Sequence, residues 1–265
     1  AVFASSFIAA SSSTSPRPGH APQGRALGTT ENSGPPQVEG DSVADRTWAR
    51  QRAMWHVTAD KTLAGCGRWR APGAAAVGLE YGGKSGARFL GVQNSHSVWG
   101  SPLAAVAIMR ERTRTVEGAV EEWLDGAPGR AVAVFTGTVQ HSREQALSDV
   151  WNNLSTCWQG VTGHRAWKGR EGARRRHGVA HFFKSVETTV GQANGWHVHQ
   201  HTLFYLERAL SEDELNALEG TLYSLWSAAA VRKGYRAPSR AHGVDLIQTT
   251  AVQDAGRVAA YVTKG

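Results

Sequence analysis

His197, His199 and His201 alternate with other residues along one short segment, and the apolar run Leu203–Leu206 follows them directly. In a β-strand, side chains two residues apart project from the same face. Imidazoles on one face can share a cation, and neutral histidine is the commonest protein metal ligand. The pattern therefore predicts a metal-binding strand; a surface strand that happens to carry histidines is the alternative.

Glu187 stands on the strand that we expect just before the histidine strand. The turn-like residues 191–195 separate a strand over 179–190 from one over 196–207, and such spacing is typical of a hairpin. A hairpin would bring Glu187 beside the histidines. Carboxylate oxygen and imidazole nitrogen together suit Mn or Mg as well as Zn, so a divalent cation is expected here.

Tyr261 and Lys264 are three residues apart near the end of the sequence, and on a helix this spacing puts them on one face. A tyrosine hydroxyl is a weak nucleophile at neutral pH, but it becomes useful where a metal polarises the electrophile and a cation stabilises charge. On a phosphodiester, the metal and Lys264 would neutralise phosphoryl oxygens while Tyr261 attacks. A half-buried core tyrosine is the plainer interpretation of Tyr261 alone.

The chain is basic, with a net charge of +7 and an isoelectric point near 9.8. The segment 164–177 contains six Lys or Arg and one Glu, which is either a solvated loop or the electrostatic footprint of a nucleic-acid binder. We expect this segment to contact DNA phosphates. The residues proposed for DNA binding are Lys168, Arg170, Arg174, Arg175 and Arg176.

Two cysteines, Cys66 and Cys157, lie far apart in the sequence. They cannot form a disulfide framework or, alone, a four-cysteine zinc site, and they favour a reducing, cytoplasmic location. No apolar run reaches the length of about 18–20 residues that a membrane span requires, so no membrane partner is expected.

The elements that must position these residues follow from hydrophobic periodicity. Strands with interspersed helices and at least one hairpin favour an α+β fold with an antiparallel sheet over a doubly wound fold. The Ser211/Glu214 and Thr250/Gln253 pairs are spaced to cap the last two helices. The expected helices cover 47–57, 103–124, 144–160, 211–231 and the C-terminal residues through Tyr261, and the further strands cover 77–81, 88–92, 131–138 and 244–250.

Composition divides the chain into three parts. Residues 1–45 are rich in Ser, Pro, Gly and Thr with few large apolar residues, so we expect a disordered or loosely attached segment. Residues 46–128 would form an accessory region with a hairpin and a long helix. Residues 129–265 would form the domain that carries the site.

Two segments together resemble a known family. Asn194–His201 (NGWHVHQH) before an apolar strand, and Tyr261–Lys264 (YVTK) some sixty residues later, resemble the rolling-circle replication initiators of bacterial plasmids, which are HUH endonucleases. Val134–His141 (VFTGTVQH) is similar to the family's upstream strand motif. Lys184–Thr189 (KSVETT) is similar to its acidic strand. The order and spacing match over roughly 130–264.

The resemblance assigns roles to individual residues. His199 and His201, next to the apolar strand, would bind the metal with Glu187, and His197 would be accessory. Tyr261 would be the nucleophile, supported by Lys264. The implied fold is a central antiparallel sheet of about five strands with helices covering one face.

This sequence also departs from the family pattern. Gln200 stands where the family prefers a bulky apolar residue, but its side chain should face away from the metal. Arg257 occupies the position of a Glu that activates water in some relatives. The segment 95–104 resembles a family segment that carries three cysteines, but Ser95, Ser101 and Ala104 replace them here. This replacement excludes a zinc ribbon. Family members usually continue past the tyrosine motif, so the stop at Gly265 suggests C-terminal truncation.

The implied function is a metal-dependent single-strand DNA endonuclease and strand transferase, with Mn or Mg favoured over Zn. It would initiate rolling-circle plasmid replication through a covalent 5′-phosphotyrosine. Single-stranded or cruciform origin DNA would be its partner, with host replication proteins as further partners. Two alternatives stand beside it: a non-catalytic basic nucleic-acid-binding protein, and a zinc hydrolase that would not need Tyr261.

Overall fold

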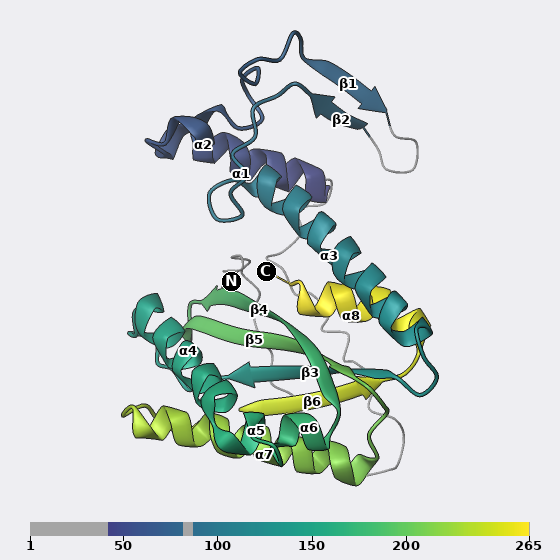
Figure 1. The fold of residues 1–265 in the computed structure, drawn as a ribbon. Helices are drawn as coiled ribbons and strands as arrows, with labels where there is room; N and C mark the ends of the chain where they lie inside the picture. The colour runs from purple at the N-terminus through teal and green to yellow at the C-terminus, as the bar shows by residue number, and fades with distance from the viewer. Residues whose placement is uncertain (1–41, 82–86, 265) are drawn as a thin grey trace. The chain divides into compact units, whose positions relative to one another are not determined.

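In a computed structural model of the chain, residues 42–81 and 87–264 are described (Figure 1). They form two compact units, and the boundary between Arg112 and Thr113 falls within helix α3 (Pro102–Asp125). The expected segment 1–45 lies outside the described residues up to position 41, but residues 43–45 are helical.

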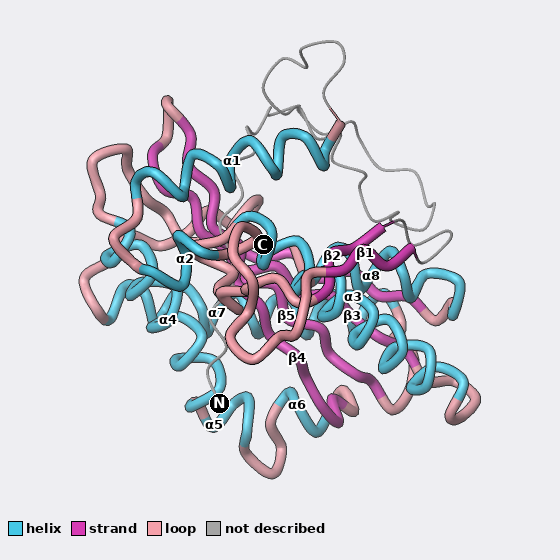
Figure 2. Tube along the Cα trace, turned by 90° about the horizontal axis from the view of Figure 1, so that it is seen from above, coloured by secondary structure: helices cyan, strands magenta, loops and turns pink. Residues whose placement is uncertain are grey.

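The larger unit is built on a four-stranded antiparallel sheet in the order β4-β5-β3-β6 (Figure 1). This confirms the α+β antiparallel fold, although the described part of the sheet has four strands rather than about five. The strands, which are magenta in Figure 2, are β3 (Ala131–Thr138), β4 (Val179–Gly191), β5 (Gly195–Leu206) and β6 (Val244–Thr249).

Side-chain alternation gives this sheet two apolar faces. One face carries Phe135 and Phe204 and is covered by α4 (Leu147–Gly163) and α7 (Glu212–Arg232). The other carries Val134 and Leu203. It is covered by the C-terminal part of α3 and by α8 (Ala255–Val262), which lies across the sheet from α7 in Figure 1. The expectation that helices cover only one face is therefore wrong.

The N-terminal ends of α7 and α8 show which of the two expected capping boxes forms. Ser211 and Glu214 form the expected capping box of α7. The expected Thr250/Gln253 box does not form, because a 3₁₀ turn over Val252–Asp254 precedes α8. Thr249 Oγ1 instead donates to Asp254 at 2.6 Å. Two short helices in the basic segment were not expected, α5 (Arg165–Lys168) and α6 (Ala173–Arg176).

The smaller unit contains α1 (Val43–Val57), α2 (Lys61–Gly65) and a hairpin of β1 (Gly78–Tyr81) with β2 (Ala87–Leu90). Its interior includes a polar network. Ser101 Oγ donates to Gln51 Oε1 at 2.8 Å and lies 3.0 Å from Cys66 Sγ. All three side chains are buried, and Ser101 links the other two by hydrogen bonding.

None of the helices in residues 42–81 and 87–264 is both long enough and apolar enough to cross a lipid bilayer.

Candidate metal and tyrosine site

The β4–β5 hairpin forms as expected and sets the register of the histidines. Glu187 pairs directly with His199 across the two strands, and Ser185 pairs with His201. Glu187 Oε2 lies 3.0 Å from His201 Nε2. At the turn, Gly195 has a φ of +68°, a conformation that glycine adopts without steric cost. The three proposed ligands therefore share one end of one sheet face.

Odd-numbered residues of β5 and even-numbered residues of β3 face α8, and this brings in Tyr261. The Thr136 Oγ1 atom lies 3.3 Å from both Tyr261 Oη and His201 Nδ1. The Tyr261 and His201 rings meet edge to face with centres 4.9 Å apart. Lys264 Nζ lies 4.8 Å from the centre of the Tyr261 ring. The Tyr261 hydroxyl and His201 are thus joined by Thr136.

Gln200 projects to the opposite face of β5, as predicted. Its side chain is buried and donates from Nε2 to Thr202 Oγ1 at 3.0 Å. The presence of Gln200 in place of an apolar residue consequently leaves the histidine face unchanged.

Burial controls the protonation of His199. Desolvation, together with the neighbouring His197 and His201, lowers the pKa of His199 to about 3, because burial disfavours the charged imidazole. Its Nδ1 atom is buried and has no hydrogen-bond partner among the described residues. A neutral imidazole with an unused nitrogen is the form that ligates metals.

The pKa values of the two acids of the site, Glu187 and Tyr261, shift in opposite directions. Burial acts to raise the pKa of Glu187, but the hydrogen bond with His201 and the charges of His201, His199 and Lys264 outweigh it, so the pKa is lowered. Burial raises the pKa of Tyr261, and the carboxylates of Asp245 and Glu187 add to this effect.

Arg257 lies one turn before Tyr261 in the sequence but pairs with Asp254 at 2.5 Å, and half of its side chain is exposed. Burial, which raises the pKa of Tyr261, opposes formation of the phenolate.

The donor set of Glu187, His199 and His201 fits a divalent cation in chemical type. The arrangement is closed, however: in the described ranges no three His, Cys, Asp or Glu side chains are placed to hold one ion. Glu187 Oε2 and His201 Nε2 bond each other directly at 3.0 Å, and a metal would need the lone pair of that nitrogen in place of its proton. Metal binding would require that hydrogen bond to open.

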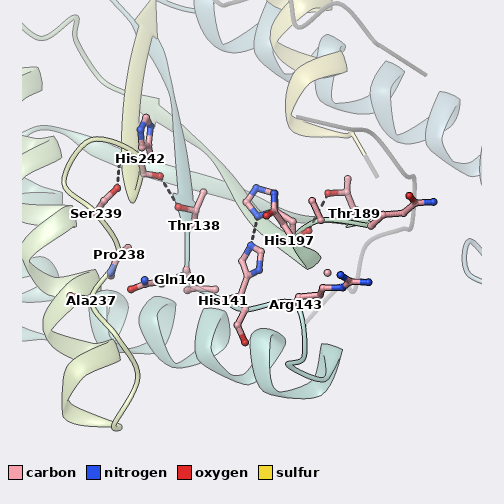
Figure 3. Close-up of a pocket in the computed structure, with 17 residues that line it drawn as sticks. Thr138, Gln140, His141, Arg143, Thr189, His197, Ala237, Pro238, Ser239 and His242 are labelled. Carbon is pink, nitrogen blue, oxygen red and sulfur yellow. Dashed lines mark hydrogen bonds between the residues drawn. The ribbon is translucent and has the colours of Figure 1, made fainter. Parts of the chain in front are cut away.

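A second pair of histidines lies beside this site. His141 Nε2 is 2.6 Å from His197 Nδ1 (Figure 3), and the rings of His197 and His199 have centres 3.9 Å apart. A pocket of about 820 Å³ opens at this pair. It is lined by the segments 138–143, 189–197 and 237–242, so no local sequence signal marks it (Figure 3).

Sequence reasoning missed Thr136 and Ser185. Ser185 donates to the backbone carbonyl of Val262 and so ties α8 to β4. Both residues lie on the histidine face by strand parity, each paired with His201 across the sheet. Parity could have found them, but a lone Ser or Thr in a strand gives no chemical signal.

The basic segment is divided between structure and solvent. Arg174 donates to the carbonyl groups of Val179 and Ala180 and lies over the ring of Phe182. It therefore secures the start of β4. The other four residues proposed for DNA binding are exposed, and their contact with DNA stays a prediction: Lys168, Arg170, Arg175 and Arg176.

The fold and site define an α+β protein with histidine, carboxylate and tyrosine groups on one face of an antiparallel sheet. No protein-family profile matches the chain, and no solved structure matches it. Among curated proteins, the chain is similar to Protein rep of Streptomyces lividans, with 29% identity over 216 residues. The match covers 66% of this chain and 46% of the relative, so the chain spans about half of that protein's length.

Proposed function

We propose that this chain is a replication initiator of the Rep type, which nicks one DNA strand and keeps its 5′ end on Tyr261. The observation that carries the proposal is the hydrogen-bonded line from Tyr261 through Thr136 to His201, on the face that also presents His199 and Glu187. The name of the similar Streptomyces protein, Protein rep, supports the replication role.

The chemistry is a phosphoryl transfer. The Tyr261 oxygen attacks phosphorus, a new P–O bond to tyrosine forms, and the bond to the 3′ oxygen breaks. The proton lost by the phenol balances the proton gained by the 3′ hydroxyl. Lys264, close to the Tyr261 ring, stabilises the negative charge on the phosphoryl oxygens.

The raised pKa of Tyr261 means that the phenol is protonated at neutral pH, so its proton must leave during attack. Thr136 orients the phenol, because its hydroxyl lies within 3.3 Å of both the phenol oxygen and His201 Nδ1. The phenol proton passes to water, and the leaving 3′ oxygen takes a proton from water.

Glu187, His199 and His201 are the residues that would hold Mn or Mg. When bound, the cation would supply Lewis-acid polarisation of the phosphoryl oxygen. The low pKa of His199 keeps that ligand neutral at physiological pH, which removes proton competition for it.

The test removes one atom. The chain is incubated with Mn and a labelled single-stranded origin library, and covalent adducts are isolated and mapped. Tyr261→Phe should abolish nicking and the adduct, because the attacking oxygen is gone, while the fold and DNA affinity are retained. Lys264→Ala should slow nicking about tenfold, since a flanking charge contributes about 1.4 kcal/mol.

Three other tyrosines serve as internal controls in that mapping. A label on Tyr205, Tyr223 or Tyr235 would refute the assignment of Tyr261. Absence of any adduct, with DNA binding retained, would favour the non-catalytic nucleic-acid-binding alternative.

A further inference from the structure

The positive charge of the chain is concentrated in the smaller unit. Residues 42–112 carry ten Lys or Arg against four Asp or Glu, a net of +6, whereas residues 113–265 carry seventeen against fifteen, a net of +2. Residues 1–41 carry two against three. The unit that holds the tyrosine site is thus nearly neutral, and the accessory unit is strongly basic.

Most acids of the smaller unit have structural roles. Asp45 and Ser42 form the capping box of α1, and Asp60 caps α2. Glu80 forms an ion pair with Arg88 across the hairpin. Asp45 also interacts electrostatically with Arg52 and Arg46, but four carboxylates are too few to balance the ten Lys or Arg of the unit.

The cations of α1 lie away from its packed side. Gln51 and Trp55 turn inward and bond the carbonyl of Cys66, and Trp48 reaches the ring of Phe89. Arg50 and Arg52 are exposed, as is Lys61 at the start of α2. Arg50 and Arg52 point to different sides of α1, so the positive potential that attracts a polyanion is a property of the whole unit, with its net charge of +6.

The hairpin of the same unit exposes large apolar side chains. Leu79 pairs with Phe89 and Tyr81 with Ala87, so alternation puts all four on one face. Tyr81 is 77% exposed, Leu79 67% and Phe89 58%. Monomeric proteins seldom expose such clusters without a partner. Exposed aromatic rings in a basic unit are suited to stacking on unpaired bases.

We propose that the smaller unit, residues 42–112, is a DNA-binding module for single-stranded DNA. The cations of α1 and α2 contact phosphates, and the hairpin aromatics stack on bases. This site is separate from the Tyr261 site, and its occupancy does not depend on cleavage.

The experiment measures binding of the full chain to a fluorescent single-stranded oligonucleotide in EDTA, where failure of the proposed nicking cannot affect the result. The triple variant Arg50→Gln/Arg52→Gln/Lys61→Gln should reduce the slope of log affinity against log salt by about 2, because each lost single-strand phosphate contact contributes about 0.7. A matched triple, Arg232→Gln/Lys233→Gln/Arg236→Gln, removes the same charge from exposed positions in the larger unit and should leave the slope unchanged. Equal slope changes in the two triples would overturn the proposal.

Stacking is tested at Tyr81. Tyr81→Ala should weaken single-strand binding about fivefold or more, and Tyr81→Phe should retain affinity because the ring is kept. Val57→Ala is the matched control, since Val57 is 78% exposed in the same unit but is not aromatic. An unchanged affinity of Tyr81→Ala would refute stacking. If the basic triple lost binding only to phosphatidylglycerol vesicles and kept binding to DNA, the surface would belong to a membrane and the proposal would fail.

Discussion

At the scale of single residues, the site depends on groups that the fold keeps neutral or paired. His199 is neutral because of burial, and Tyr261 is protonated for the same reason. Glu187 is charged because His201 bonds it. The sequence motif identified these residues, but their pKa values depend on burial and on neighbours distant in sequence, such as Thr136 and Asp245 for Tyr261.

Removing the proposed ligands gives the first prediction. His199→Ala or His201→Ala should abolish nicking, because a divalent ion would lose one of its three protein ligands, while circular dichroism remains that of the parent chain. His197→Ala should have a milder effect, since His197 bonds His141 rather than Glu187. Titration calorimetry with Mn checks the affinity. Wild-type cleavage by the double variant in the same metal would show that the ligands are wrongly assigned.

Stability should depend on pH through His199. The unfolded chain binds a proton at this residue near pH 6.5, whereas the folded chain binds it only near 3. Stability is therefore full above about pH 6.5 and declines as the pH falls toward 3, by up to about 1.4 kcal/mol per pH unit. Urea unfolding at pH 7 and pH 5 should show a smaller loss for His199→Gln than for the metal-free parent chain. Equal losses would mean that His199 is protonated in the folded state.

At the scale of elements, periodicity identified β3 with its bounds and placed α7 and both strands of the hairpin to within a residue or two. Strand parity then located the histidine face correctly. The start of α8 was misjudged, because Thr249 bonds Asp254 and favours a 3₁₀ turn over the expected capping box. The 820 Å³ pocket and the contact of Thr136 with Tyr261 were not predicted, since each joins segments forty or more residues apart.

The turn of the β4–β5 hairpin offers a test of register. Gly195 has a positive φ, and a Cβ there would lie 2.6 Å from the carbonyl oxygen of Arg143. Gly195→Ala should therefore destabilise the chain by about 1–3 kcal/mol and weaken metal binding, because the pairing of Glu187 with His199 would shift. Gly191→Ala is the matched control: Gly191 pairs with Gly195, and a Cβ there would meet no atom within 4 Å. Similar melting temperatures for the two variants would contradict this view of the turn.

At the scale of the whole molecule, the two units differ in the kind of polar side chains that they bring together. The larger unit gathers ligand-type side chains around Tyr261. In the smaller unit, Cys66, Ser101 and Gln51 form a hydrogen-bonded network, and such a network stabilises only while every buried member is satisfied.

We therefore predict no structural zinc in the smaller unit. Plasma emission spectroscopy of the His199→Ala/His201→Ala chain should find no stoichiometric zinc, and EDTA should leave its melting temperature unchanged. Ser101→Ala should cost about 1–3 kcal/mol, since Gln51 Oε1 would lose its buried donor. Zinc that survived in the double variant would point to other ligands.

The separation between His201 and Tyr261 has a consequence for synthesis. Sixty residues divide them, so at about 5–20 residues per second the histidines leave the ribosome several seconds before the tyrosine. Until α8 arrives, Val134 and Leu203 lack the cover that Val258 and Val262 provide. A nascent chain that already presents its histidines thus lacks the proposed nucleophile and leaves this sheet face open to proteases, and the arrival of α8 changes both conditions at once.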